Sequence, residues 1–373
     1  MINTIYIHLR FITKIVSLIG VCFFLGCCNH LPESYMCFED VENITFTRTV
    51  DVSEKDLQNV CTGIEGCSNM FIYDSLLVCA FTGADYYWKI YSLNDNQFKT
   101  WLIRKGHGHN EFSSPPSSLT FKCDDKNLYC EFMTNKNHLY RCNLTQSLLL
   151  GNDSITDITP NVEMQSCRWM SRLDDSIYYY SDLLLGYNKY NRKLLSGNSF
   201  QDISGIETLN DFRVENDINT ISYLYSLSPD HQRIAEAMLR LNQINLYSFD
   251  GTFKKTLCIG DALMDVNAVD KSGTSMFSRG SMLKCFGGVV SYSDYFVALY
   301  HGVSYKDYET SDDKQTCSLM VFDWDGNPIL KVNVPFTITS FGISKDGYMY
   351  FLRNNTETEQ ILKYKRLDDL LDS

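Results

Sequence analysis

The feature that most constrains this chain is a strand–turn–strand pattern that recurs six times along it. Each copy places Asp, Asn, Gly or Ser in a tight turn between two runs rich in β-branched and aromatic residues. The turns are marked by Asp74, Asp125, Asp175, Asp230, Gly288 and Asp346. The mean step between markers is about 54 residues. A period of this length in a chain of short strands predicts propeller blades, one for each marker.

A second signal follows each marker. It is a strand with aromatic character that ends in another polar turn or, in the last copy, near the chain end, at residues 90–94, 139–143, 187–191, 246–251, 321–326 and 362–365. Each repeat therefore supplies strands A and B around its first turn and strands C and D around its second. Both sets of turns are expected to be short.

The sixth repeat has sequence for only three strands, at 337–344, 348–353 and 360–366. An unassigned strand pattern stands before the first repeat, at residues 43–50. We expect this N-terminal strand to complete the last blade, because a closed ring leaves no open sheet edge. The predicted fold is an all-β, six-bladed β-propeller of four-stranded antiparallel blades. Two stacked β-sandwiches are the alternative, but they leave both the extra strand and the missing one unexplained.

The composition agrees with a β-rich fold. Aromatic residues make up 13% of the chain and alanine occurs only seven times, which disfavours helices. An α/β enzyme with helices on both faces of a sheet is therefore not expected. The formal net charge of -12 argues against nucleic-acid binding, which needs a basic surface.

The N-terminus predicts a cellular location. Arg10 and Lys14 precede an apolar run, residues 15–26, that is too short to span a bilayer as a helix and has the flanks of a secretory signal. The run ends Phe24-Leu25-Gly26-Cys27, which resembles a bacterial lipobox with Cys27 as the acylated residue. We expect a signal peptide at 1–26, a lipid-anchored tether at 27–42 and the propeller at 43–373. An ordinary signal peptide with incidental cysteines is the alternative.

Two segments resemble a known family. Ser228-Pro229-Asp230 with Ile234-Ala235 is similar to the blade turn of TolB-type propellers. Residues 104–112, Arg-Lys-Gly-His-Gly-His-Asn-Glu-Phe, resemble the G-x-G-P-x-E-F signature of TolB-like six-bladed propeller lipoproteins common in Bacteroidetes, with His109 in place of the proline. The resemblance extends over residues 43–366. It implies the propeller fold and an envelope location, and it implies no particular chemistry.

The long connections are expected on one face of the ring, where B–C loops and D–A crossovers meet. They are residues 106–118, 150–167, 197–222, 260–282 and 300–316. Long loops on a rigid scaffold commonly carry binding sites, and two of these connections are rich in acidic residues. Such a face suits a basic peptide, a sugar stacked on tyrosines or a cation. The candidate ligand-binding residues are His107, His109, Asn110, Glu111, Tyr305 and Tyr308. Solvated loops without a ligand are the alternative.

No pattern in the sequence points to catalysis. His107 and His109 have a spacing that suits a metal, but no third ligand accompanies them, so we expect neither a metal nor a cofactor there. We expect instead that Gly106 and Gly108 permit a tight turn, which Glu111 and Phe112 hold in place. No nucleophile elbow, zincin motif or P-loop occurs.

These observations favour a non-catalytic, monomeric binding module of the cell envelope. Its partner would be an envelope protein or a glycan, and it would contact the membrane through the lipid anchor alone. A propeller hydrolase or lyase with a divalent metal in the central channel is the alternative. One covalent feature is also open: a turn centred on Lys136 would place Cys130 opposite Cys142, where a disulfide could form.

Overall fold

The computed structural model describes residues 34–61, 63–108, 110–134, 137–164, 166–272, 280–310, 315–354 and 359–372. The chain divides into two units, Met1–Tyr35 and Met36–Ser373. The predicted signal peptide and Cys27 lie outside the described residues. Within the described ranges, no helix is both long enough and apolar enough to cross a lipid bilayer.

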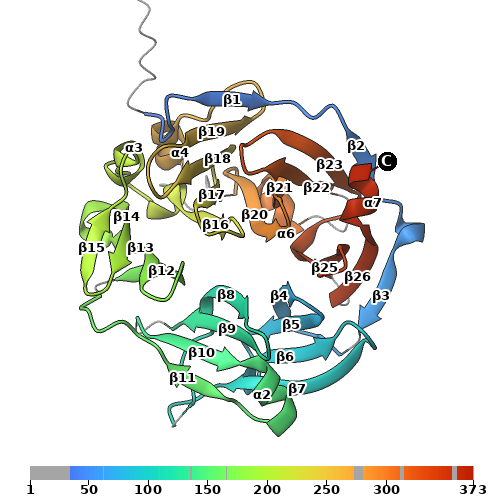
Figure 1. The fold of residues 1–373 in the computed structure, drawn as a ribbon. Coiled ribbons are helices and arrows are strands. Elements are labelled where there is room, and N and C mark those ends of the chain that lie inside the picture. The colour runs from blue at the N-terminus through green and yellow to red at the C-terminus, as the bar shows by residue number, and fades with distance from the viewer. Residues whose placement is uncertain are drawn as a thin grey trace, which may run out of the picture. The chain divides into compact units, whose positions relative to one another are not determined.

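The unit Met36–Ser373 is built from six β-sheets arranged around a centre (Figure 1). In each sheet the strands pair antiparallel from the centre outward, except that the outermost strands of two sheets pair parallel. We number the sheets as blades 1 to 6 in chain order. This arrangement confirms the six-bladed β-propeller that the 54-residue period predicts.

Blades 1 to 3 each hold four consecutive strands. Blade 1 is formed by β4 (Cys67–Tyr73), β5 (Leu76–Phe81), β6 (Tyr86–Ser92) and β7 (Gln97–Arg104). Blade 2 is formed by β8 (Ser117–Cys123), β9 (Leu128–Met133), β10 (Leu139–Asn143) and β11 (Ile155–Asp157). Blade 3 is formed by β12 (Cys167–Arg172), β13 (Ile177–Leu184), β14 (Lys189–Ser196) and β15 (Ser199–Asp202).

Blades 4 to 6 each recruit a strand from the N-terminal segment. Blade 4 is formed by β16 (Tyr223–Leu227), β17 (Arg233–Met238), β18 (Gln243–Ser248), β19 (Lys254–Ile259) and β1 (Val41–Ile44). Blade 5 is formed by β20 (Leu283–Tyr292), β21 (Tyr295–Ser304), β22 (Cys317–Asp323), β23 (Pro328–Val334) and β2 (Thr49–Asp51). Blade 6 is formed by β24 (Ile338–Ile343), β25 (Tyr348–Asn354), β26 (Glu359–Arg366) and β3 (Gln58–Cys61).

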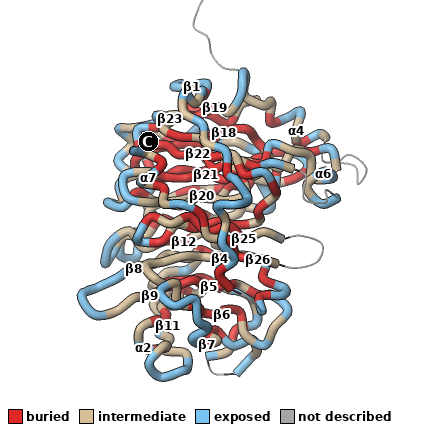
Figure 2. Tube along the Cα trace, turned by 90° about the vertical axis from the view of Figure 1, so that its right-hand side faces the viewer, coloured by how far each residue is buried: buried red, intermediate tan, exposed pale blue. Residues whose placement is uncertain are grey.

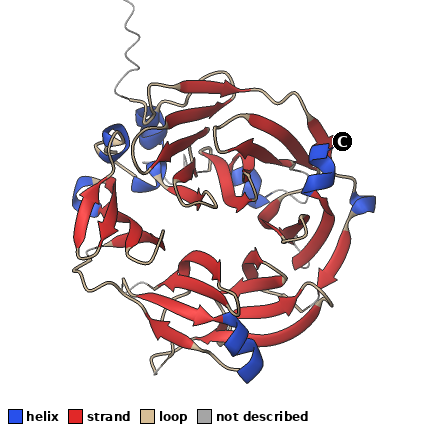
Figure 3. Cartoon of the chain, in the orientation of Figure 1, coloured by secondary structure: helices blue, strands red, loops and turns tan. Residues whose placement is uncertain are grey.

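The helices among the described residues are short and lie in the connections or, for the last one, after the final strand (Figure 3). They are η1 (Glu54–Asp56), α2 (Leu144–Leu150), η2 (Leu185–Tyr187), α3 (Glu207–Asn210), η3 (Ile218–Ile221), α4 (Val266–Ser272), α6 (Tyr305–Thr310) and α7 (Leu367–Asp372). The scarcity of alanine agrees with this distribution, because few segments have the propensity for a longer helix.

In blades 2 and 3 the aspartate just before the marker residue stabilises the turn through its side chain. Asp124 Oδ1 accepts hydrogen bonds from the backbone N–H groups of Lys126 and Asn127, both at 2.8 Å. Asp174 Oδ1 accepts from Ser176 N and Ile177 N in the same way, at 2.7 and 2.8 Å. These bonds to the charged form lower the pKa of both carboxyl groups. The A–B turns of blades 2 and 3 are therefore Asx turns.

The fifth A–B turn is not where the sequence analysis placed it. We expected it at Gly288, but β20 continues through that residue to Tyr292, and the chain turns at Ser293 and Asp294. The pairing of β20 with β21 shifts register between Phe286 and Gly288. A Cβ at Gly287 would collide with the His301 ring, so the glycine permits a close approach between two strands. A glycine pair inside a strand thus gave a false turn signal.

Two C–D connections also differ from the expectation. In blade 2 the predicted turn residue Asn143 is instead the N-cap of α2, and its side chain accepts a hydrogen bond from Gln146 N. In blade 3 the strand predicted at 187–191 was expected to end in a turn at Asn191, but β14 continues through that residue, and the C–D turn lies at Gly197 and Asn198, between β14 and β15. Asparagine is common both in turns and at helix N-caps, so an asparagine alone does not show which of the two a segment forms.

An N-terminal strand does complete the last blade, but it is not the predicted one. The strand β3, residues 58–61, pairs antiparallel with β26. The predicted segment 43–50 instead runs along the outer edges of the two preceding blades, where β1 pairs parallel with β19 and β2 pairs parallel with β23 (Figure 1). Phe46 packs edge-to-face on Phe322, with ring centres 5.4 Å apart. Each of blades 4 and 5 already has four strands, so β1 and β2 are added fifth strands.

Residues just before β1 are packed against blade 4. Met36, Cys37 and Phe38 are buried, and Gln243 Nε2 donates a hydrogen bond to the carbonyl oxygen of Met36 at 2.5 Å. Phe38 N donates to Thr256 Oγ1 at 2.9 Å. The second half of the predicted tether is therefore in contact with the propeller.

The core lies between neighbouring sheets, and buried residues follow the strands (Figure 2). It includes a polar network between blades 3 and 4, centred on Arg192 and Glu236, which are fully buried. Arg192 Nε donates to both Glu236 carboxylate oxygens, at 2.7 and 2.9 Å. The hydroxyl groups of Tyr179 and Tyr247 also donate to Glu236, at 3.0 and 2.7 Å. The buried charges are thus paired and hydrogen-bonded.

The expected opposition of two cysteines is confirmed. Cys130 pairs directly with Cys142 across β9 and β10. Both are free thiols in this structure, which contradicts the hypothesis of a disulfide between them. The Cys142 Sγ contacts Ser147 Oγ at 3.6 Å, and Cys130 Sγ contacts the carbonyl oxygen of Glu131 at 3.7 Å. Burial raises the pKa of Cys142 to about 12.

Candidate functional site

The antiparallel order of each blade places B–C loops and D–A crossovers on one face, which we call the loop face. Three of the five predicted long connections join strands there as expected: 106–118 between β7 and β8, 260–282 between β19 and β20, and 300–316 between β21 and β22. The other two are only partly on this face. Residues 150–167 include β11 and 197–222 include β15, so each range begins on the opposite face.

The family-like segment 104–112 forms a closed turn between blades 1 and 2. Gly108 N donates to Glu111 Oε2 at 2.9 Å, and Glu111 N donates back to the carbonyl oxygen of Gly108 at 3.1 Å. A Cβ at Gly106 would overlap the Glu111 carboxylate, so only glycine fits there. Phe112 is buried, with its ring edge-to-face on Phe132 at 5.5 Å. The structure thus confirms that Glu111 and Phe112 hold this crossover in place.

The remaining candidates of this segment are not drawn into a pocket. His107 and Asn110 are exposed, and Asn110 has a positive φ of 59°, which asparagine tolerates. His109 lies outside the described residues. The segment joins blades 1 and 2, whereas Tyr305 and Tyr308 belong to blade 5, so the two groups of candidates are on different parts of the ring.

The loop face is most elaborate over blades 4 and 5. Asp270 in α4 is buried, and its carboxylate accepts hydrogen bonds from the backbone N–H groups of three successive residues, Glu215, Asn216 and Asp217, at 2.7 to 2.9 Å. This contact joins the crossover that precedes blade 4 to the one that follows it. Because the acceptor is an ionised carboxylate, these bonds are stronger than neutral ones.

The network continues through Asp217 toward blade 5. Arg240, in the B–C loop of blade 4, pairs with Asp217 Oδ2 at 2.6 Å. Formation of this ion pair lowers the pKa of Asp217, although burial of the carboxyl group acts in the opposite direction and is the largest single effect. The Arg240 guanidinium also lies 5.7 Å from the centre of the Tyr305 ring. Tyr305 begins α6 and donates its backbone N–H to the carbonyl oxygen of Met282.

Tyr308, one turn further along α6, covers two basic side chains of blade 5. Lys284 Nζ lies 3.2 Å from the centre of the Tyr308 ring. The His301 ring meets Tyr308 edge-to-face, with centres 5.0 Å apart. Burial lowers the pKa of Lys284 to about 8, with Glu309 opposing the change. Burial, together with the charge of Lys284, lowers the pKa of His301 to about 3.

We call Tyr305, Tyr308, Lys284, His301, Arg240 and Asp217 the blade 5 cluster. Sequence reasoning found the two tyrosines of α6 and, as one of several acidic loop residues, Asp217. It missed Lys284, His301 and Arg240. Lys284 and His301 stand in strands whose pattern is otherwise apolar, and an ionisable residue in such a strand was the available signal. Both side chains lie under α6 because of the register in which β20 and β21 pair. The sequence analysis placed a turn at Gly288, inside β20, and therefore could not predict this register.

The described part of the chain contains no group of three or more His, Cys, Asp or Glu side chains in an arrangement that could hold a metal ion. The blade 5 cluster instead holds two cationic side chains against aromatic rings. Arg240 and Lys284 occupy ring faces of the two tyrosines. Tyr308 is also in contact with His301, so its ring is engaged by the protein itself.

Comparison with known proteins gives a family and a fold. The profile of a family described as TolB-like 6-blade propeller-like matches residues 66–346. A solved structure of a DUF4221 family member from Bacteroides vulgatus is similar at a TM-score of 0.51 and 11% identity, covering 83% of this chain and 96% of that one. A calcium-binding regucalcin from Agrobacterium tumefaciens gives a TM-score of 0.46 at 10% identity, covering 86% and 96%. No curated protein matches the sequence.

Proposed function

Because the chain belongs to the TolB-like six-bladed propeller family, we propose that it is a binding module of the cell envelope that recognises a protein partner through its loop face. The observation that carries the proposal is the joining of the connections of blades 4 and 5 into one supported surface. Non-catalytic propellers bind their partners through connections that are held rigidly on one face.

The charge of this surface indicates the kind of partner. Its described connections, 203–222, 260–272 and 305–310, expose the acidic side chains of Glu207, Asp211, Glu215, Asp261, Asp307 and Glu309. The same residues expose only three basic side chains, those of Arg213, Lys271 and Lys306. An excess of carboxylates favours a partner with a basic segment, which would be steered toward this face.

Of the two partner classes that the sequence allowed, the blade 5 cluster favours protein over glycan at this face. A sugar would need an open ring to stack on, whereas the rings of Tyr305 and Tyr308 are only partly exposed and each has one face toward Arg240 or Lys284. The exposed residues of α6 are instead polar or charged, which suits ion pairs and hydrogen bonds with a polypeptide. The hydrolase with a channel metal stays an alternative prediction, and no arrangement of described residues favours it.

Crosslinking in cells tests the loop-face proposal. A photoreactive amino acid at Lys306 should capture one discrete protein, and the same group at Asn94, in a turn of the opposite face, should not. Asp307→Lys with Glu309→Lys should abolish that capture, because the partner then meets like charge. Asp294→Lys with Asp125→Lys is the matched control on the opposite face and should leave capture intact. Equal capture from both faces, or none from Lys306, would overturn the proposal.

The membrane anchor is a separate part of the proposal and has its own test. We expect Cys27 to carry the acyl chains, because it follows a signal-like run and a small residue. Growth with an alkyne-labelled fatty acid should label the protein and Cys27→Ser should not be labelled, whereas Cys28→Ser should keep the label. Labelling that survives Cys27→Ser would show that the lipid is attached elsewhere.

A further inference from the structure

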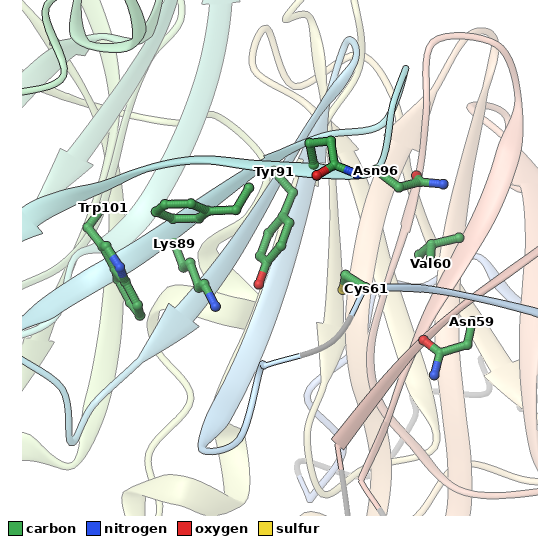
Figure 4. Close-up of a pocket in the computed structure, with 9 residues that line it drawn as sticks. Asn59, Val60, Cys61, Lys89, Tyr91, Asn96 and Trp101 are labelled. Atoms are coloured by element: carbon green, nitrogen blue, oxygen red, sulfur yellow. The ribbon is translucent and has the colours of Figure 1, made fainter.

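A surface groove lies at the seam where the ring closes, between β3 of blade 6 and strands β6 and β7 of blade 1 (Figure 4). Its volume is about 710 Å³, within the range of small-ligand sites. It is lined by Asn59, Val60, Cys61, Lys89, Tyr91, Asn96, Gln97, Phe98 and Trp101. None of these belongs to the blade 5 cluster or to the proposed protein-binding face.

A β-bulge creates the aromatic wall of the groove. Lys89 pairs with Trp101 and Tyr91 pairs with Phe98, with a register shift between Ile90 and Tyr91. Phe98 and Trp101 are three positions apart, so a regular strand would place them on opposite faces. The bulge adds one residue to β7 and brings both rings to the side of Lys89 and Tyr91. Figure 4 shows Trp101, Lys89 and Tyr91 along one side of the groove.

The rings enclose a cation that belongs to the protein. Lys89 Nζ lies 5.2 Å from the centre of the Tyr91 ring, 5.5 Å from that of Phe98 and 5.2 Å from that of Trp101. It donates a hydrogen bond to the carbonyl oxygen of Gly63 at 2.5 Å. The cage is therefore already filled by an ammonium group, which argues against a cationic ligand. The cation also holds the rings in place before any ligand arrives.

The outer parts of the wall remain open to solvent. Phe98 is 45% exposed, which is unusual for so large an apolar side chain. Trp101 is partly exposed and is supported from behind by Phe81, at a ring separation of 5.5 Å. Their planes are inclined by 58°, so a ligand ring could stack on one or the other of them without rearrangement of the blade.

Apart from Lys89 and the Tyr91 hydroxyl, the polar groups of the lining are amides. Asn59, Asn96 and Gln97 are exposed, and each side chain offers both N–H donors and a carbonyl acceptor. No carboxylate is among the lining residues, and the neighbouring Asp95 is paired with Lys99 at 2.6 Å. Aromatic rings with several amides and no acid match a ligand that has apolar C–H faces and many hydroxyl groups. Those are the properties of a neutral sugar chain.

We propose that this groove binds a neutral polysaccharide, with pyranose rings stacked on Phe98 and Trp101 and hydroxyl groups bonded to Asn59, Asn96 and Gln97. The inference does not rest on the loop-face proposal, because the two sites share no residue. Together they would let one module hold a glycan and a protein at the same time.

Binding of cellohexaose, xylohexaose and mannohexaose to the purified protein tests the proposal by isothermal titration. We expect at least one of the three to bind, and Phe98→Ala to weaken it about tenfold or more, because a stacking face is lost. Gln97→Ala should weaken it less. Tyr187→Ala, which removes another exposed ring on blade 3, is the matched control and should bind as the unaltered protein does.

The outcomes are decisive in either direction. Phe98 is 45% exposed, so its replacement should lower the thermal midpoint only slightly, and binding lost by a protein that is still folded would then report on the groove itself. The proposal is overturned if none of the three sugars binds at millimolar concentration, or if Phe98→Ala binds them unchanged. Binding of a proline-rich peptide that depends on Phe98, without sugar binding, would assign the groove to polypeptide and also overturn it.

Discussion

The ammonium nitrogen of Lys284 lies 3.2 Å from the centre of the Tyr308 ring, so a lysine of the innermost strand of blade 5 is covered by the short helix of the following loop. The ring compensates only in part for the water that the ammonium has lost, because burial lowers the pKa of Lys284. The position of α6 on the loop face is thus coupled to the protonation of Lys284.

This coupling predicts a pH dependence. The pKa of Lys284 is about 8 in the folded protein, against about 10.4 for an unperturbed lysine. Between these values the unfolded chain binds more protons than the folded one, so the free energy of unfolding should rise with pH. Lys284→Met should lose that rise. Urea unfolding of both proteins at several pH values from 8 to 10 measures the difference, and identical slopes would contradict the prediction.

The Glu111 carboxylate should act in stability and not in binding. Its bond to Gly108 N is removed in Glu111→Ala, and we expect the free energy of unfolding to fall by about 1 kcal/mol. Capture of a partner from position 306 should be unchanged, because the segment lies between blades 1 and 2. Urea unfolding and crosslinking of the same variant check both parts. Lost capture with unchanged stability would make Glu111 a binding residue after all.

The buried pair of Arg192 and Glu236 should dominate the stability of the contact between blades 3 and 4. Arg192→Met leaves a buried carboxylate without its cation, and we expect a loss of about 3–5 kcal/mol. Adding Glu236→Gln should recover part of that loss, since no unpaired charge then remains. Denaturant unfolding of the two single variants and the double variant gives the coupling. Strictly additive losses would show that the two charges do not depend on each other.

Closure by β3 should matter more than the added strands on blades 4 and 5. Val60→Pro places a proline in β3 and removes a buried side chain from the core at the seam. Val50→Pro places a proline in β2, which only extends a blade that already has four strands. We expect the thermal midpoint to fall further for Val60→Pro. A larger fall for Val50→Pro would mean that the N-terminal segment stabilises the ring mainly through the added strands.

Much of the fold could be predicted because it depends on local chemistry repeated many times. Asp124 and Asp174, each just before a marker residue, bend the chain through bonds to residues two and three positions away, so the turns can be recognised from their local sequence. The turn formed by Gly106, Gly108 and Glu111 is equally local, and its role was predicted correctly. Where the same residue types serve another purpose, as Gly287 and Asn143 do, the local pattern was misleading.

By itself, the sequence determined the number of blades, the antiparallel order of their strands and the need for an N-terminal strand at the seam. Only the tertiary structure decided which strand that is, because residues 43–50 and 58–61 are both able to pair and the choice depends on which edges remain open. It also decided the sites. Lys284 and Tyr308 come from segments far apart in the sequence and are in contact only in the folded protein. Phe98 lies on the same side as Trp101 because of a register shift between β6 and β7. Register is fixed by the packing of whole sheets, so no short stretch of sequence contains it.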